Sequence, residues 1–150
     1  MSFKINISEK NGKTYHLETE SEGLVDKELN QKVSGIEVSP DLNGYEFQIT
    51  GASDKAGFTS VDEEGIGLRK VLLSYGKGMK RRSRREGKKK RSNFTPKGLR
   101  LRRTARGKVI SPQISQINLM VLKAGAKELA EIFPEQNKPI QKAEPIATSS

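Results

Sequence analysis

Alternating hydrophobic and polar positions near the start of the chain predict a β-hairpin. In FKINIS, residues 3–8, the side chains of Phe3, Ile5 and Ile7 would share one face of a strand. An Asn-Gly pair follows at 11–12, and both residues tolerate the positive φ that a tight hairpin turn needs. TYHLE, residues 14–18, then returns as the second strand, which places His16 on its surface.

Similar patterns predict further strands and two short helices. Apolar runs or alternation indicate strands at 36–39, 45–50, 69–75, 108–111 and 117–123. The segment 26–33 is typical of a short helix, with Asp26 as its N-cap and Gly35 as its C-terminal stop. Apolar side chains at helical spacing indicate a second helix within residues 126–133.

A faint internal repeat suggests how the strands assemble. Residues 38–55 and 110–127 share a Ser-Pro pair and several matching apolar positions. Two such halves would close into one barrel, which removes exposed sheet edges. The predicted fold is therefore mainly β: a small closed or partly open six-stranded β-barrel with one or two short helices. Its core would contain Phe47, Ile49, Leu72, Leu119 and Val121.

Charge is concentrated in one segment of the chain. The formal net charge is +10 at pH 7, and residues 77–108 alone hold 16 Lys or Arg and a single acid, Glu86. Residues 1–76 carry 8 basic and 13 acidic side chains, so they are mildly acidic. Such a blocky distribution indicates a polyanionic partner rather than a general aid to solubility.

RNA fits the basic segment better than a membrane or a free charged tail. The segment is rich in Arg, which binds phosphate with two parallel hydrogen bonds. Predicted strands flank it on both sides, and it lacks the apolar face that membrane binding uses. Few aromatics accompany the arginines, which favours structured RNA over stacked single-stranded bases. The predicted RNA-binding residues are Lys55, Lys77, Lys80, Arg81, Arg82, Arg84, Arg85, Lys88, Lys89, Lys90, Arg91, Lys97, Arg100, Arg102, Arg103 and Arg106.

For a chain of this length we expect one domain, or one domain with extensions. Residues 1–133 would form a single β-barrel RNA-binding domain, with 77–108 as a basic irregular loop. Residues 134–150 contain three prolines and no periodicity, and predict a disordered tail. No run of 18 apolar residues and no charged-then-apolar leader is present, so we expect a soluble, cytoplasmic protein without membrane partners.

Candidate chemistry outside the basic segment is sparse. The chain has no Cys and a single His, so neither a thiolate zinc site nor a multi-histidine metal site is possible within it. In GASDKAGF, residues 51–58, the glycine spacing does not fit a phosphate-binding P-loop. We interpret this stretch as a turn in which Asp54 bonds its own backbone and Phe58 fills the core, with a Lys55–phosphate contact as the alternative. No catalytic site, cofactor, metal or small-molecule substrate is expected.

Several stretches together resemble a known family. GASDKAGF, then VLLSYGKG at 71–78, the basic run, and RGKVISPQISQINLMVLKAGAKELAEIF at 106–133 occur in this order. They are similar to the archaeal and eukaryotic small-subunit ribosomal protein family number six, the "e" type. The resemblance covers about residues 3–133 and implies a β-barrel that binds RNA without catalysis. Eukaryotic members carry a long basic C-terminal extension. The short neutral tail of this chain instead resembles that of members from the archaeal branch.

The expected function is therefore that of a structural constituent of the small ribosomal subunit. It would bind and stabilise ribosomal RNA through the Arg/Lys-rich loop, beside neighbouring ribosomal proteins, in the cytoplasm. The alternative is an architectural or regulatory DNA-binding protein on a similar barrel. An enzyme acting on RNA is a third possibility, against which the absence of an acid-base pair argues.

Overall fold

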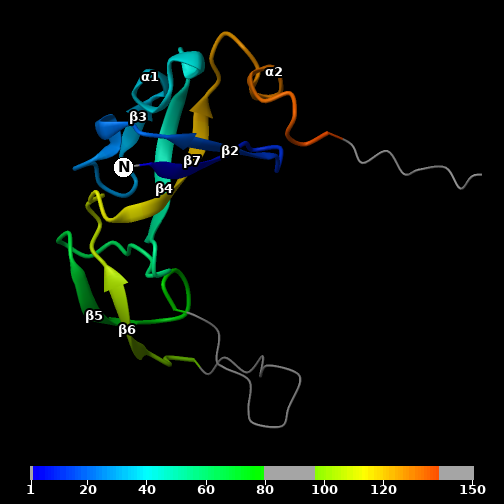
Figure 1. Ribbon diagram of the computed structural model, residues 1–150. Coiled ribbons are helices and arrows are strands. Elements are labelled where there is room, and N and C mark those ends of the chain that lie inside the picture. Colours follow the sequence, from blue (N-terminus) through cyan, green and yellow to red (C-terminus); the bar gives the residue numbers. More distant parts are fainter. Residues whose placement is uncertain (1, 80–96, 139–150) are drawn as a thin grey trace, which may run out of the picture.

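A computed structural model describes residues 2–79 and 97–138 of the chain (Figure 1). Nine of the predicted RNA-binding residues, from Lys80 to Arg91, therefore lie outside the described residues, as does most of the predicted C-terminal tail. Within the described part, the fold is mainly β, as the sequence predicts.

The largest element is a five-stranded sheet with the strand order β2-β1-β7-β4-β3. Strands β1 and β7 run parallel, and the other neighbours run antiparallel. The strands are β1 (Phe3–Ser8), β2 (Thr14–Thr19), β3 (Lys32–Ser34), β4 (Glu46–Asp54) and β7 (Ile114–Lys123). The predicted hairpin of β1 and β2 is confirmed, with Gly12 at φ +91° in its turn.

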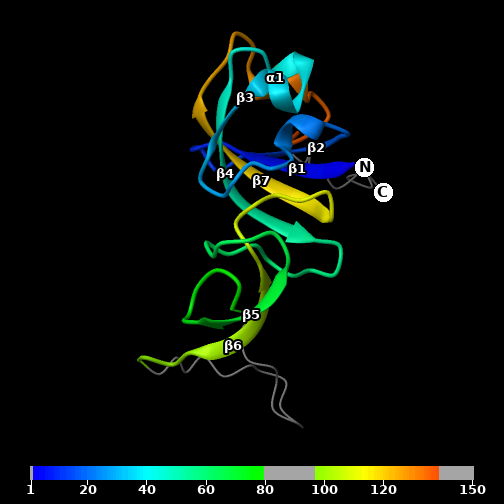
Figure 2. The ribbon, with the colours of Figure 1, turned by 90° about the vertical axis from the view of Figure 1, so that its left-hand side faces the viewer.

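A separate two-stranded ribbon pairs β5 (Leu68–Leu73) with β6 (Leu101–Arg106). It lies at one end of the molecule, beyond the end of β4 (Figure 1, Figure 2). The short helices are α1 (Gly35–Val38) and α2 (Leu129–Ile132), and the 3-10 turns are η1 (Glu22–Leu24) and η2 (Pro40–Leu42).

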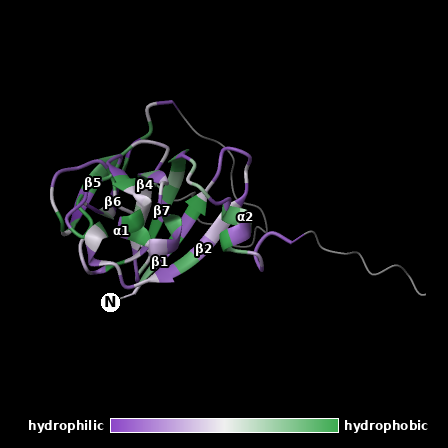
Figure 3. Cartoon of the chain, turned by 90° about the horizontal axis from the view of Figure 1, so that it is seen from above, coloured by the Kyte–Doolittle hydropathy of each residue, from purple (hydrophilic) through white to green (hydrophobic). Residues whose placement is uncertain are grey.

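The core lies on one face of the large sheet and is centred on β4 and β7. Phe47 and Ile49 are opposite Val121 and Leu119 across the two strands, and Phe47, Ile49 and Leu119 are fully buried. Viewed from above, apolar stretches lie along the strands, whereas loops around them are largely hydrophilic (Figure 3). Within the strands, buried and exposed positions alternate, and this alternation is the sequence pattern that predicts them.

The prediction of a six-stranded barrel is not confirmed. In the described residues the large sheet is open, with β2 and β3 at its edges, and β5 and β6 pair with none of its strands. The ribbon does not join the large sheet because β5 exposes residues on both of its faces. It therefore offers the large sheet no continuous apolar side. Leu72, predicted to lie in the core, belongs to this strand and remains 49% exposed.

The sequence prediction is also wrong between residues 26 and 39. Instead of the predicted helix, this segment turns at Asp26 and Asn30, which adopt φ values of +64° and +66°. The backbone N–H of Asn30 then donates to Ile49 O at 2.8 Å, which aligns the segment with β4. The predicted strand at 36–39 is instead helix α1.

Helix α1 begins with a capping box, which explains why this apolar stretch is not a strand. The side chain of Ser34 caps the first turn, and the backbone N–H of Ser34 donates to Glu37 Oε2 at 3.3 Å. Gly35 is not the end of a helix but its first residue. A Cβ there would lie 1.8 Å from Leu42 O, so only glycine permits this close approach.

The two Ser-Pro pairs of the internal repeat form matching turns. Leu42 N–H donates to Ser39 O at 3.1 Å, and Ile114 N–H donates to Ser111 O at 3.0 Å. Each turn leads towards one strand of the central β4–β7 pair. The predicted strand at 108–111 is absent, however, because this stretch forms only a single bridge, between Glu28 and Val109.

The C-terminal part of the described chain packs against β2. The predicted second helix is present as α2, and Phe133 directly after it stacks on Tyr15 with ring centroids 5.8 Å apart. Gln136 then exchanges two hydrogen bonds with the backbone of His16, and Asn137 Nδ2 donates to Thr14 O at 2.8 Å. Residues 134–138, assigned to the tail by the sequence, thus cover the edge of β2.

Candidate nucleic-acid interface

The β5–β6 ribbon and the residues just before β6 expose several basic residues of the segment 77–108. Arg102 and Arg103 are exposed in β6, and Arg100 and Lys97 are exposed just before it. Arg102 is paired with Leu72 and Arg103 with Val71, so the two guanidinium groups project from opposite faces of the ribbon. The segment 101–106, predicted as irregular loop, is therefore a strand that offers positive charge on both sides.

Strand β5 adds charge that the sequence prediction missed. Arg69 and Lys70 are both exposed and alternate between the two faces of the ribbon. Their position in a predicted strand next to the basic segment was the available signal. Leu68 and Leu72 are also exposed, so the face shared by Lys70 and Arg102 mixes apolar and basic side chains.

Arg106 differs from the other predicted RNA-binding residues. Its side chain is only 7% exposed, and its Nε donates to Asp54 Oδ2 at 2.7 Å. A second hydrogen bond runs from Nη1 of Arg106 to Gln113 Oε1 at 3.1 Å. Because this guanidinium is enclosed and already bonded, we remove Arg106 from the predicted RNA-binding set and assign it to the architecture.

Asp54 is held as a carboxylate by the groups around it. Burial raises the pKa of Asp54, but hydrogen bonds from Arg106 and from the Phe58 backbone N–H outweigh it and place the pKa below its usual value. The bond from Phe58 N–H to Asp54 Oδ1 measures 2.8 Å, which confirms the predicted Asp turn. Phe58 itself is only half-buried and lies outside the core cluster.

The base of the ribbon is joined to the preceding loop through backbone hydrogen bonds. Arg106 N–H donates to Thr59 O at 3.0 Å, and Val61 N–H donates to Arg106 O at 2.9 Å. A Cβ on Gly107 would lie 1.9 Å from Gly65 O, so the two segments touch at their backbones. Together with the Asp54–Arg106 pair, these contacts fix where the ribbon leaves the sheet.

The remaining basic residues of the predicted set occupy two further places. Lys55 is exposed in the turn after β4. The Nζ of Lys77 donates to the backbone oxygen of Thr50, so this side chain lies along the outer face of β4. Lys108 was not in the predicted set, and its ammonium lies 3.2 Å from Glu28 Oε2.

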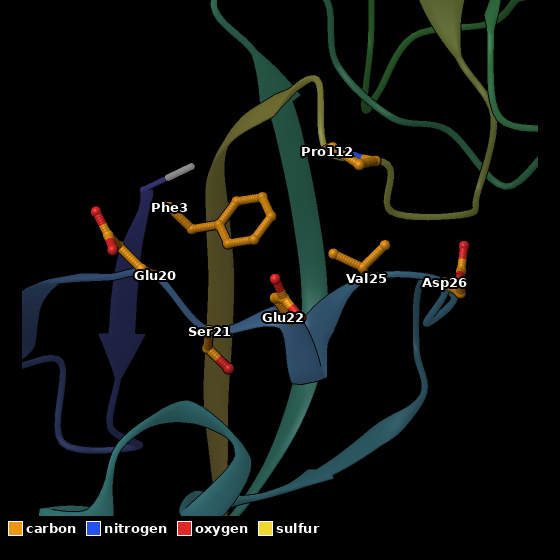
Figure 4. A pocket seen from close by; sticks show the side chains of 7 residues that line it. All are labelled: Phe3, Glu20, Ser21, Glu22, Val25, Asp26 and Pro112. Atoms are coloured by element: carbon orange, nitrogen blue, oxygen red, sulfur yellow. The ribbon is translucent and has the colours of Figure 1, made fainter.

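A pocket elsewhere on the surface has the wrong charge for RNA. Figure 4 shows its lining, which comprises Phe3, Glu20, Ser21, Glu22, Val25, Asp26 and Pro112. The carboxylates at its rim would repel phosphate groups. In the ranges 2–79 and 97–138 no three His, Asp or Glu side chains are grouped to hold a metal ion. No helix among the described residues has the length and apolarity needed to cross a membrane.

Comparison with known proteins identifies relatives that share most of the chain. The sequence model of the family described as "Ribosomal protein S6e" matches residues 3–134. A protein of Methanococcus maripaludis strain C5 named "Small ribosomal subunit protein eS6" is 39% identical over 131 residues, which cover 86% of this chain and 94% of the relative. Proteins of the same name from Methanosphaera stadtmanae and Archaeoglobus fulgidus are 37% and 35% identical, and cover 90% and 92% of this chain. The matches cover 95% and 100% of these two relatives.

Proposed function

Because this chain belongs to the ribosomal protein S6e family, of the archaeal type, we propose that it is a structural constituent of the small ribosomal subunit and acts in translation. We infer that it binds ribosomal RNA through the basic ribbon and the segment 77–108. Its place is then the cytoplasmic ribosome, with small-subunit RNA and neighbouring ribosomal proteins as partners. The proposed role is architectural rather than catalytic.

The observation that carries this proposal is the placement of the described arginines. Arg102 and Arg103 are exposed on opposite faces of a ribbon that stands away from the apolar core, and Arg100 is exposed just before it. Arg106 alone is used inside the protein, where Asp54 neutralises it. Exposed arginines with no structural task suit the binding of phosphates, which they contact with two hydrogen bonds each.

Shape is the second argument for a structured RNA. A narrow ribbon with charge on two faces can lie between two phosphate backbones, and such contacts position a protein without reading bases. The proposal does not require base stacking, and the ribbon strands contain no aromatic residue.

Co-sedimentation tests the proposal. The full chain carrying an affinity tag is mixed with archaeal small ribosomal subunits that have been stripped of their own copy by high salt, and the mixture is separated on a sucrose gradient. We expect the chain to migrate with the small subunit and to return to the top of the gradient after RNase treatment.

Two outcomes would contradict the proposal. The first is that the chain stays at the top of the gradient although the subunits remain intact. The second is that the chain binds duplex DNA as tightly as it binds ribosomal RNA at the same salt concentration. The control is a variant in which Lys10, Lys13 and Lys127, three residues that lie outside the ribbon, are changed to Gln. This variant loses three positive charges and should still co-sediment with the small subunit.

A further inference from the structure

Exposed apolar side chains gather on and around strand β5. Among the described residues, five large apolar side chains are strongly exposed, and four of these lie within residues 66–75. The four are Ile66, Leu68, Leu72 and Tyr75, each between 40% and 51% exposed. Apolar residues that cluster in this way on a protein surface, rather than being scattered over it, mark a contact with another molecule.

One face of the β5–β6 ribbon is covered by the protein itself. Val71, Leu73 and Leu101 share this face and are half-buried. A Cβ built on Gly78 would lie 2.9 Å from Val61 Cγ1 and 3.1 Å from Leu73 Cδ1. The segments before and after β5 therefore pack together against this side of the ribbon.

The opposite face of the ribbon lacks such a cover. It carries Leu68, Lys70 and Leu72 of β5 and, paired with the last two, Thr104 and Arg102 of β6. We call these five residues the leucine face. Four of them are exposed and Thr104 is half-buried. Alternate residues of a strand are about 7 Å apart, so Lys70 lies between the two leucines, and Arg102 lies directly across from Leu72.

The charge of the ribbon favours RNA over a protein as the molecule that covers the leucine face. Neither β5 nor β6 contains Asp or Glu, whereas Arg69, Lys70, Arg102 and Arg103 are all exposed. A protein partner would have to supply a matched set of carboxylates, while RNA brings a phosphate with every nucleotide. The leucine face is also continuous with the arginines for which RNA binding is proposed above.

Phosphate contacts alone do not account for the two leucines. The backbone of a paired RNA helix is charged and polar, and the flat apolar sides of its bases are stacked on one another. In bulges, loops and ends the bases are unstacked, and their apolar sides can be reached by a protein. Leu and Ile side chains make contacts of this kind with bases in other nucleic-acid complexes.

We propose that the leucine face binds an unpaired nucleotide of ribosomal RNA. Its base packs against Leu68 and Leu72, while Lys70 and Arg102 contact the phosphates on either side of it. The inference rests on the proposed function and names the kind of RNA that the ribbon selects, which is a helix interrupted by an unpaired nucleotide. The contact with the base is apolar, so it does not depend on which base is present.

Titration with two RNAs tests the inference. The full chain is titrated with a fully paired RNA duplex and with the same duplex carrying a bulge of unpaired adenines. The wild type should bind the bulged duplex about tenfold more tightly, because only this RNA can cover the leucines. Leu68→Ala and Leu72→Ala should each weaken binding to the bulged duplex by about fivefold and leave binding to the paired duplex unchanged.

The salt dependence separates an apolar contact from a loss of charge. In both leucine variants the slope of log affinity against log salt should stay at the wild-type value, because no phosphate contact is removed. The melting temperatures should stay close to that of the wild type, since about half of each side chain is exposed.

Ile36→Ala is the matched control. Ile36 in α1 is the fifth strongly exposed apolar side chain of the described residues, at 62%, and α1 lies at the other end of the molecule from the ribbon (Figure 1). This variant should bind both RNAs as the wild type does.

The outcomes distinguish this inference from the proposed function. Equal wild-type affinity for the two RNAs, or leucine variants that bind the bulged duplex as tightly as the wild type, would overturn the inference and leave the phosphate contacts of the ribbon in place. A shallower salt slope in the leucine variants, or equal weakening by Ile36→Ala, would also overturn it.

Two further outcomes are decisive. Leucine variants that bind both RNAs normally but no longer co-sediment with stripped small subunits would assign the leucine face to a neighbouring protein, and the inference would be wrong. A wild-type chain that binds neither RNA would contradict the proposed function and this inference together.

Discussion

Arg106 of β6 and Asp54 of β4 form an ion pair of 2.7 Å inside the protein and join the basic ribbon to the large sheet. Their side chains are 7% and 5% exposed, so neither charge is stabilised by bulk water. The pair lies where the ribbon leaves the sheet. Its removal should therefore affect both the stability of the fold and the orientation of the exposed arginines.

Removing one partner of this pair should be strongly destabilising. In Asp54→Ala the guanidinium of Arg106 remains buried without its counter-charge, and we expect the free energy of unfolding to fall by about 3–5 kcal/mol. The double variant Asp54→Leu with Arg106→Met removes both charges and should be closer to the wild type. Urea denaturation of the wild type and these variants measures this coupling, and an equal decrease in stability for the single and double variants would contradict it.

The same pair should make the protein sensitive to acid. Since the folded state holds the pKa of Asp54 below its ordinary value, the stabilisation from this group is complete above the unfolded pKa of about 3.9 and is lost as the pH falls below it. The free energy of unfolding should therefore decrease as the pH falls below about 4. Asp54→Asn should show a smaller decrease over that range than the wild type, whereas Asp41→Asn, at an exposed site in η2, should follow the wild type.

Two leucines that both lie in apolar runs of the sequence should differ in how much they contribute to the stability of the fold. Leu119 is fully buried between β1 and β4, so Leu119→Ala should cost about 2–5 kcal/mol. Leu72 is 49% exposed on the ribbon, so Leu72→Ala should change stability by only about 0.5 kcal/mol or less. Thermal melting of both variants decides the point, and a similar decrease in each would show that the ribbon shares the main core.

The exposed arginines should contribute to RNA binding without contributing to stability. Changing Arg100, Arg102 and Arg103 to Ala should reduce the slope of log affinity against log salt by about 1 for each phosphate that is no longer neutralised. The melting temperature should stay at the wild-type value or rise slightly, because repulsion between like charges is relieved. If the triple variant unfolds instead, the arginines belong to the folded architecture and the account of the ribbon is wrong.

Much of the large sheet could be predicted from the sequence because its strands carry strict alternation. Phe3, Ile5 and Ile7 of β1 all face the core, as their spacing indicates. The segment from Asp26 was misjudged because Leu29 and Val33, four residues apart, are both buried without a helix. A turn at Asn30 achieves the same burial, and only contact with β4 decides between the two.

The candidate interface could be predicted only in part, since tertiary pairing decides which charges are free. Arg106 and Arg103 are equivalent in the sequence, yet Asp54 lies 52 residues before Arg106 and nothing local announces their contact. The capping box of Ser34 and Glu37 is a local signal in the sequence, since Glu three residues after Ser favours the start of a helix there. The barrel prediction failed for a related reason, because the apolar residues of β5 meet no partner sheet within the described residues.

Cross-linking of the chain within assembled small subunits tests the central claim most directly. Ultraviolet irradiation followed by mass spectrometry identifies the peptides that are covalently joined to ribosomal RNA. We predict RNA cross-links in peptides that contain Arg100, Arg102 and Arg103, and none in the peptide that carries the acids Glu20 and Glu22. Cross-links confined to the acidic side, with the ribbon peptides recovered free of RNA, would contradict the claim that this protein holds ribosomal RNA through its basic ribbon.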